Sequence, residues 1–121
     1  MQKEKNVMEH FSEKFPLLQR LYDLYQATEH FSKSEDNTLR KSSEITILEI
    51  IELVVIATRQ EKHEKLSTFR QIKRKVDALE VFMNMSVEVG SMATKPAQEF
   101  KEIIDSVNKM IGGWEKACED K

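Results

Sequence analysis

The sequence predicts an all-α protein that folds as an antiparallel up-down-up-down four-helix bundle. Only 3 Gly and 2 Pro occur among 121 residues, which indicates few turns and long elements. Apolar residues recur at helical spacing in four blocks. A β-sandwich, a barrel or a doubly wound nucleotide fold would need more turns or Gly-rich loops. We therefore expect residues 1–121 to form a single domain.

The first helix is predicted from about Pro16 to Glu29. Apolar residues keep helical spacing on both sides of Pro16, so either the helix starts there or a longer helix kinks there. We favour a start near Pro16, with residues 1–14 as a less ordered helical lead-in. The polar residues 32–37 then predict a loop that ends in a helix N-cap. The apolar stripe comprises Met8, Phe11, Phe15, Leu18, Tyr22 and Tyr25.

The second helix, from about Thr38 to Arg59, is apolar over more than half of its surface. Its β-branched residues would permit a strand, but its length and the i, i+3 spacing of two glutamates favour a helix. Such a helix must lie at the centre of the bundle, or another subunit must cover one flank. We therefore predict a homo-oligomer. Its expected interface is the narrow stripe that holds Ile45, Glu49, Glu52 and Ile56.

The third and fourth helices are predicted from about Lys62 to Gly90 and from Thr94 onward. Thr94 is a candidate N-cap, and Pro96 suits the first turn that follows it. The third helix has its apolar stripe at Leu66, Phe69, Ile72, Val76, Leu79 and Met83. The stripe of the fourth helix comprises Phe100, Ile104, Val107, Ile111, Trp114 and Cys118.

No residue pattern in the chain indicates catalysis, a metal or a cofactor. A di-iron bundle needs Glu-x-x-His pairs, and none of His10, His30 and His63 has a Glu three residues before it. His30 could belong to a phosphotransfer domain, but it lies at a helix end and lacks the downstream glycine. Cys118 continues an apolar stripe, as a small hydrophobic residue does. We expect a protein that is not an enzyme and that uses no metal or cofactor.

The single cysteine and the hydropathy pattern indicate a cytoplasmic protein. One cysteine cannot form a disulfide within the chain, which fits a reducing compartment. The N-terminus lacks the apolar core of a signal peptide. The longest apolar-rich run is far shorter than the roughly 20 residues that a membrane span needs. We expect no membrane partner.

Positive charge is concentrated between Arg59 and Lys75, which hold seven basic and two acidic residues although the whole chain has a net charge of -2. Such a segment can neutralise the phosphates of RNA. It can equally be a solvated helix face that pairs with acidic groups on neighbouring helices or on a protein partner. The candidate RNA-binding or partner-binding residues are Arg59, Lys62, Lys65, Arg70, Lys73, Arg74 and Lys75.

The C-terminal run 103–117 is an apolar helix with Gly112-Gly113-Trp114 near its end. Together with the long basic and apolar third helix, it resembles the four-helix bundle family of Avd, the accessory variability determinant of diversity-generating retroelements. Relatives of Avd include proteins encoded in ribosomal-RNA intervening sequences. The segment 21–25, followed by His30-Phe-Ser-Lys, and the aliphatic run 48–57 look like the first and second helices of that family.

The resemblance implies a non-enzymatic homopentamer that binds a reverse transcriptase and its template RNA and supports mutagenic cDNA synthesis. A protein-interaction bundle of the intervening-sequence type, without nucleic-acid binding, remains the alternative. Glycines inside a helix cost about 1 kcal/mol each relative to Ala. We therefore expect a neighbouring helix or subunit to approach closely at Gly112 and Gly113, with Trp114 as a buried anchor.

Overall fold

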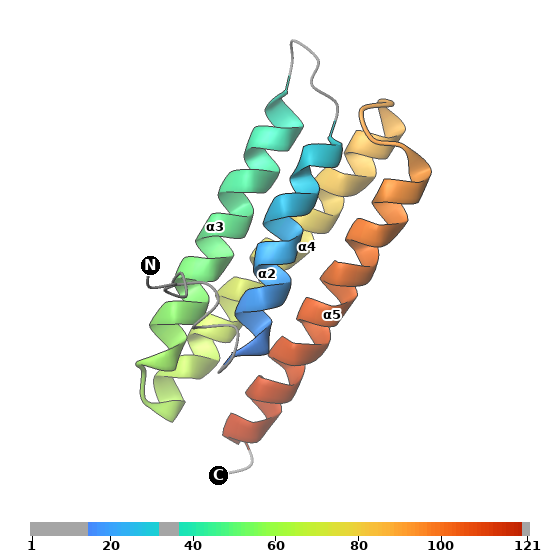
Figure 1. The fold of residues 1–121 in the computed structure, drawn as a ribbon. Helices are drawn as coiled ribbons and strands as arrows, with labels where there is room; N and C mark the ends of the chain where they lie inside the picture. Colours follow the sequence, from blue (N-terminus) through green and yellow to red (C-terminus); the bar gives the residue numbers. More distant parts are fainter. Residues whose placement is uncertain (1–14, 32–36, 120–121) are drawn as a thin grey trace, which may run out of the picture.

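The computed structural model describes residues 15–31 and 37–119, and within these ranges every regular element is a helix. The elements are α2 (Pro16–Ala27), the short 3-10 helix η1 (Thr28–His30), α3 (Thr38–Thr58), α4 (Lys62–Glu88) and α5 (Thr94–Glu119). Figure 1 shows the four long helices side by side. The predicted all-α fold is confirmed for this part of the chain. The predicted lead-in 1–14 and most of the predicted loop lie outside the described residues.

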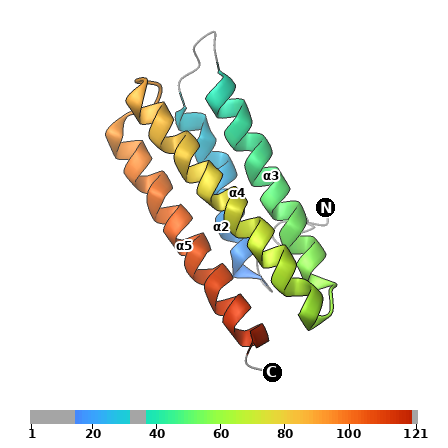
Figure 2. The ribbon, with the colours of Figure 1, turned by 180° about the vertical axis from the view of Figure 1, so that it is seen from behind.

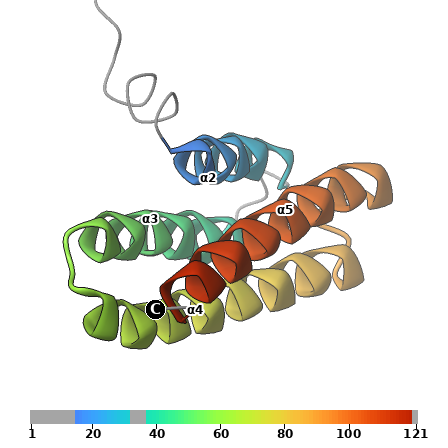
Figure 3. The ribbon, with the colours of Figure 1, turned by 90° about the horizontal axis from the view of Figure 1, so that it is seen from below.

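The core runs along the middle of the four helices. α3 packs mainly on α4, α5 packs on α4, and α2 lies against both α3 and α5. Figure 3 shows this arrangement from below. Each long helix places fully buried aliphatic side chains there, among them Leu21, Ile47, Ile72 and Ile104. Burial of each such side chain contributes about 1.5–3 kcal/mol. No helix in the described ranges has the length and apolar character that a bilayer crossing requires.

α2 begins at Pro16, as predicted, because the backbone of Phe15 leaves the helical region. Phe15 has φ −148° and ψ 82°, and its carbonyl accepts the N–H of Leu18 at 3.0 Å. A proline in the first helical turn loses no hydrogen bond. At the other end, the Thr28 hydroxyl donates to the Tyr25 carbonyl at 2.7 Å where η1 takes over. Because the backbone of Phe15 is not helical, α2 starts at Pro16 and is not the continuation of a longer helix that kinks there.

α4 is bounded by specific caps at both ends. At its start, the Glu61 N–H donates to the Glu64 carboxylate at 2.9 Å, and the Glu61 side chain caps Glu64 in return, so the two form a capping box. At its end, Gly90 has φ +79°, and the Ser91 N–H donates to the Ser86 carbonyl at 2.8 Å. This is a Schellman motif, in which glycine adopts the left-handed conformation without a Cβ penalty.

The start of α5 differs by one residue from the expectation. Thr94 is the first residue of the helix, and the Ala97 N–H donates to the Ala93 carbonyl at 3.1 Å. Thr94 is thus inside the helix and not its N-cap. Differences of one or two residues are usual at helix ends, and the face that α5 buries is unchanged.

Candidate assembly and nucleic-acid interface

Two of the seven candidate basic residues pair with acidic groups on neighbouring helices. Lys73 Nζ lies 2.8 Å from Glu115 Oε1 of α5. Lys75 Nζ lies 2.9 Å from Glu49 Oε1 of α3. Both pairs are partly exposed and join α4 to its two neighbours. Glu115 and Glu49 therefore partly neutralise the charges of Lys73 and Lys75, which the sequence alone did not indicate.

The remaining five candidates differ in their surroundings. Lys65 is half-buried, and its Nζ donates to the Gln60 carbonyl at 2.8 Å. The other four are exposed and have no ion pair with any described residue. Arg59 follows the end of α3 and Lys62 begins α4, so both lie at the short α3–α4 connection. The unpaired candidates are Arg59, Lys62, Arg70 and Arg74.

Arg70 and Arg74 form the compact part of this set. They are four residues apart on α4, so their side chains share a face. Ile72 and Val76, which are fully buried, occupy the opposite side of the helix. Lys62 lies eight residues before Arg70, or about 12 Å along the helix axis. The like charges of Arg70 and Arg74, four residues apart, destabilise the helix slightly, and a phosphate bound between them would relieve the repulsion.

The predicted interface stripe of α3 is open to solvent. Ile45 is 56% exposed and Ile56 is 42% exposed, and Leu48, which the sequence reading did not single out, is 50% exposed. α3 is therefore not enclosed at the centre of the bundle, and the other predicted alternative, that another subunit covers one flank of α3, stays a prediction. Glu52 is exposed without an ion pair to any described residue, whereas Glu49 bonds to α4 within the same chain.

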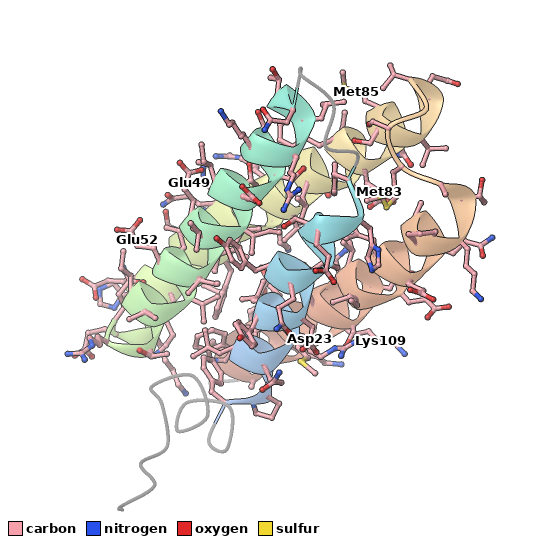
Figure 4. All side chains as sticks on the ribbon, turned by 45° about the horizontal axis from the view of Figure 1, so that its top comes forward. Asp23, Glu49, Glu52, Met83, Met85 and Lys109 are labelled. Atoms are coloured by element: carbon pink, nitrogen blue, oxygen red, sulfur yellow. The ribbon has the colours of Figure 1, made fainter. Side chains whose placement is uncertain are left out.

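Sequence reasoning missed a second apolar row, which lies on α4. Val81 is 52% exposed, Met85 47% and Val89 68%. Their i, i+4, i+8 spacing was a readable signal, but the stronger core stripe of the same helix obscured it. Figure 4 labels Met85 near the C-terminal end of α4, with Glu49 and Glu52 on α3.

The two apolar rows lie on adjacent helices. α3 and α4 lie side by side and run in opposite directions (Figure 2), and the Lys75–Glu49 pair fixes their register. Ile45 is four residues from Glu49 and Val81 is six from Lys75, so they lie within about 3 Å of the same level along the bundle. We call this the α3–α4 apolar surface, which comprises Ile45, Leu48, Ile56, Val81, Met85 and Val89.

The Gly112-Gly113-Trp114 motif does not act as expected within the described chain. A Cβ added at either glycine would meet no atom within 4 Å, so no neighbouring helix approaches closely there. Trp114 is only half-buried. Its ring packs edge-to-face against Phe15 and Phe69, with centroid distances of 5.1 Å and 4.8 Å. The motif thus combines exposed backbone with an aromatic cluster.

Within the described ranges, no three His, Cys, Asp or Glu side chains gather as a metal site would require. No protein-family model matches the chain, and no curated protein or solved structure matches it either.

Proposed function

We propose that this chain is a non-catalytic accessory protein, an antiparallel up-down bundle that assembles with copies of itself and binds RNA. The observation that carries the proposal is the pair Arg70 and Arg74, exposed on the outer face of α4 without an ion pair to any described residue. Cations that no acidic group neutralises are those that attract phosphates. Nothing in the proposal requires a metal, a cofactor or a catalytic residue.

Self-assembly follows from the α3–α4 apolar surface. The apolar side chains of this surface are between 42% and 68% exposed, and covering them gains about 25 cal/mol per Å² of apolar area. In a closed ring, each subunit would contribute its own Arg70 and Arg74. The repeated pair would produce a stronger local field than the net charge of -2 per chain suggests. The resemblance to Avd makes a homopentamer our specific proposal.

The biological role that we propose comes from the same resemblance. The assembly would bind the reverse transcriptase of a diversity-generating retroelement in the cytoplasm. It would also bind the template RNA and so support mutagenic cDNA synthesis. This part of the proposal is supported by the sequence pattern around Gly112-Gly113-Trp114, and the arginine pair on α4 is compatible with it.

A second candidate is an oligomeric protein-interaction module of the intervening-sequence type that does not bind nucleic acid. The Lys73–Glu115 and Lys75–Glu49 pairs favour it. They show that the bundle itself neutralises part of its basic segment. Arg70 and Arg74 would then bind carboxylates of a protein partner.

A mobility-shift titration with labelled structured RNA separates the two candidates. The test variant is Arg70→Glu/Arg74→Glu. The matched control is Lys95→Glu/Lys109→Glu, which changes net charge equally at two exposed lysines of α5 that have no ion pair with any described residue. Circular dichroism confirms that both variants remain helical.

We expect the test variant to lose RNA affinity and the control to retain most of it. Loss of two phosphate contacts per subunit should also lower the slope of log K against log salt by about 1.4–1.8. Equal affinity of the folded test variant and the wild type would refute RNA binding at this surface. Absence of any RNA complex with the wild type at moderate salt would support the protein-interaction module.

A further inference from the structure

An open hollow of about 410 Å³ lies at one end of the bundle, between the end of α3, the start of α2, the first turn of α4 and the last turns of α5. This end is at the bottom of Figure 1. Ligand sites in proteins are hollows of about 300–1,000 Å³ with apolar walls and a few polar groups, and this hollow has that character. It is lined by the apolar side chains Phe15, Leu18, Val55 and Trp114 and by Thr58, Arg59 and Lys65.

Two cations at the hollow favour a negatively charged ligand. Arg59 is exposed and has no ion pair with any described residue. Lys65 is half-buried, and its Nζ donates to the Gln60 carbonyl at 2.8 Å, so a neutral group holds the ammonium without cancelling its charge. None of the described residues that line the hollow is acidic. A ligand with a phosphate or carboxylate group therefore suits this site.

The aromatic wall of the hollow favours a flat ring as the other part of that ligand. The Trp114 ring packs edge-to-face against Phe15 and against Phe69. Because Phe69 is fully buried, the indole is anchored to the core. Aromatic side chains are the surfaces on which unpaired nucleic-acid bases stack. The site thus combines an anchored aromatic surface with two cations, and a nucleotide is the ligand that uses both.

We propose that this hollow binds one unpaired nucleotide of a single-stranded RNA segment, with its base against Trp114 and its phosphate on Arg59 and Lys65. The inference rests on the proposed RNA binding and adds a preference for single strands to it. The bases of an RNA duplex are paired and stacked inside the helix. A duplex can therefore offer its phosphates to the bundle but no base to the hollow. Neither Arg70 nor Arg74 lines the hollow, so RNA binding by those two arginines can be tested separately.

The first experiment follows the fluorescence of Trp114, the only tryptophan of the chain, in the full-length protein. The probes are a single-stranded oligouridine and a duplex RNA with the same number of phosphates, each titrated to saturation. We expect the single strand to quench Trp114 at least about twofold more than the duplex, because only an unpaired base can stack beside the indole. Equal quenching by the two RNAs would overturn the proposal.

The second experiment changes the hollow in two ways, with circular dichroism as the check of folding. Val55→Phe fills the hollow with a ring and keeps both cations, whereas Arg59→Gln removes one cation and keeps the walls. We expect each variant to lower the affinity for the single strand about fivefold and to change the affinity for the duplex by less than about twofold. Unchanged single-strand affinity in both folded variants would contradict the proposal.

The matched control is Lys116→Gln, which removes the same charge near the end of α5. Lys116 is exposed, has no ion pair with any described residue and does not line the hollow. The ratio of single-strand to duplex affinity should therefore stay at its wild-type value. A fall in this ratio as large as that of Arg59→Gln would refute the assignment to the hollow, since general charge would then explain the effect.

The same titrations separate this inference from the proposed function. If both RNAs bind the wild type and both hollow variants equally, the nucleotide site is refuted and RNA binding at Arg70 and Arg74 stands. Absence of any complex with either RNA would refute both. Decanoate, an aliphatic carboxylate, is the last probe. If it changes the fluorescence of Trp114 and the single strand does not, the hollow binds an apolar acid and the assignment to a nucleotide is wrong.

Discussion

Lys75 Nζ lies 2.9 Å from Glu49 Oε1 and joins α4 to α3. Lys75 belongs to the basic segment, and Glu49 belongs to the predicted oligomer interface, so the ion pair joins the two surfaces that the sequence predicted. The side chains are 37% and 47% exposed, and ion pairs of this exposure contribute about 0–1 kcal/mol. The pair therefore adds little to stability, and under the proposed RNA binding Glu49 would partly neutralise the charge of Lys75.

The adjacent residues Arg74 and Lys75 should differ in their contribution to RNA binding. We expect Arg74→Gln to weaken RNA affinity about fivefold, equivalent to about 1 kcal/mol, because an unpaired cation is lost. Lys75→Gln should change affinity by less than about twofold, because Glu49 already neutralises that charge. Parallel RNA titrations of the two variants measure this difference. A larger loss for Lys75→Gln would show that RNA displaces Glu49.

Two glycines should respond to alanine in opposite ways. Gly90→Ala should lower the free energy of unfolding by about 1–2 kcal/mol, because a Cβ is strained at φ +79°. Gly112→Ala should raise it by about 1 kcal/mol, since that site is helical and open. Urea unfolding at one fixed protein concentration measures both changes. Stabilisation by Gly90→Ala would contradict the Schellman geometry.

The buried serines Ser43 and Ser86 form a second matched pair. Both are fully buried, but Ser43 Oγ has no hydrogen-bond partner, whereas Ser86 Oγ donates to the Phe82 carbonyl at 2.8 Å. An unsatisfied buried hydroxyl costs about 1–3 kcal/mol. We expect Ser43→Ala to raise the free energy of unfolding by about 1 kcal/mol and Ser86→Ala to give no gain. The reverse order in thermal or urea unfolding would refute this explanation.

The stability of the α4–α5 contact should depend on pH through Lys101. Hydrogen bonds to Asp105 and to Glu80 raise the pKa of Lys101 above its ordinary value of 10.5. A lysine whose pKa is higher in the folded than in the unfolded protein stabilises the fold when the pH is below its pKa in the unfolded protein. This stabilisation is lost as the pH rises through its pKa in the folded protein. Lys101→Gln should therefore lower the melting temperature at pH 8 and lower it less once the pH has risen above the folded-state pKa of Lys101.

Lys95→Gln provides the control for that measurement, because Lys95 is exposed and has no ion pair with any described residue. Its melting temperature should follow that of the wild type at both pH values. A constant difference between Lys101→Gln and the wild type across the range would contradict the assigned hydrogen bonds.

The helices were predictable because their periodicity is strong and their ends carry local signals. Pro16 marks the start of α2, and Gly90 lies two residues after the end of α4. The capping box of Glu61 and Glu64 was not recognised, because glutamate is an unusual first residue of that motif. Local chemistry thus fixes the boundaries to within a few residues.

The surfaces were less predictable, because contacts between helices depend on rotation and register. Sequence spacing could not show that Glu49 meets Lys75, or that Glu115 meets Lys73. The exposure of Ile45 agrees with its place on the predicted interface stripe, but its position beside α4 depends on how the helices pack. Sequence periodicity shows which residues share a face of a helix. Which helix packs against that face is known only from the structure of the bundle.

The central claim is that other copies of the chain cover the α3–α4 apolar surface. Sedimentation equilibrium tests it most directly, with Ile45→Glu/Val81→Glu as the test variant and Tyr25→Glu, which changes an exposed residue of α2, as the control. We predict an oligomer of five times 14.2 kDa for the wild type and the control, and a folded monomer for the test variant. A wild-type protein that sediments as a folded monomer at every concentration would contradict the account.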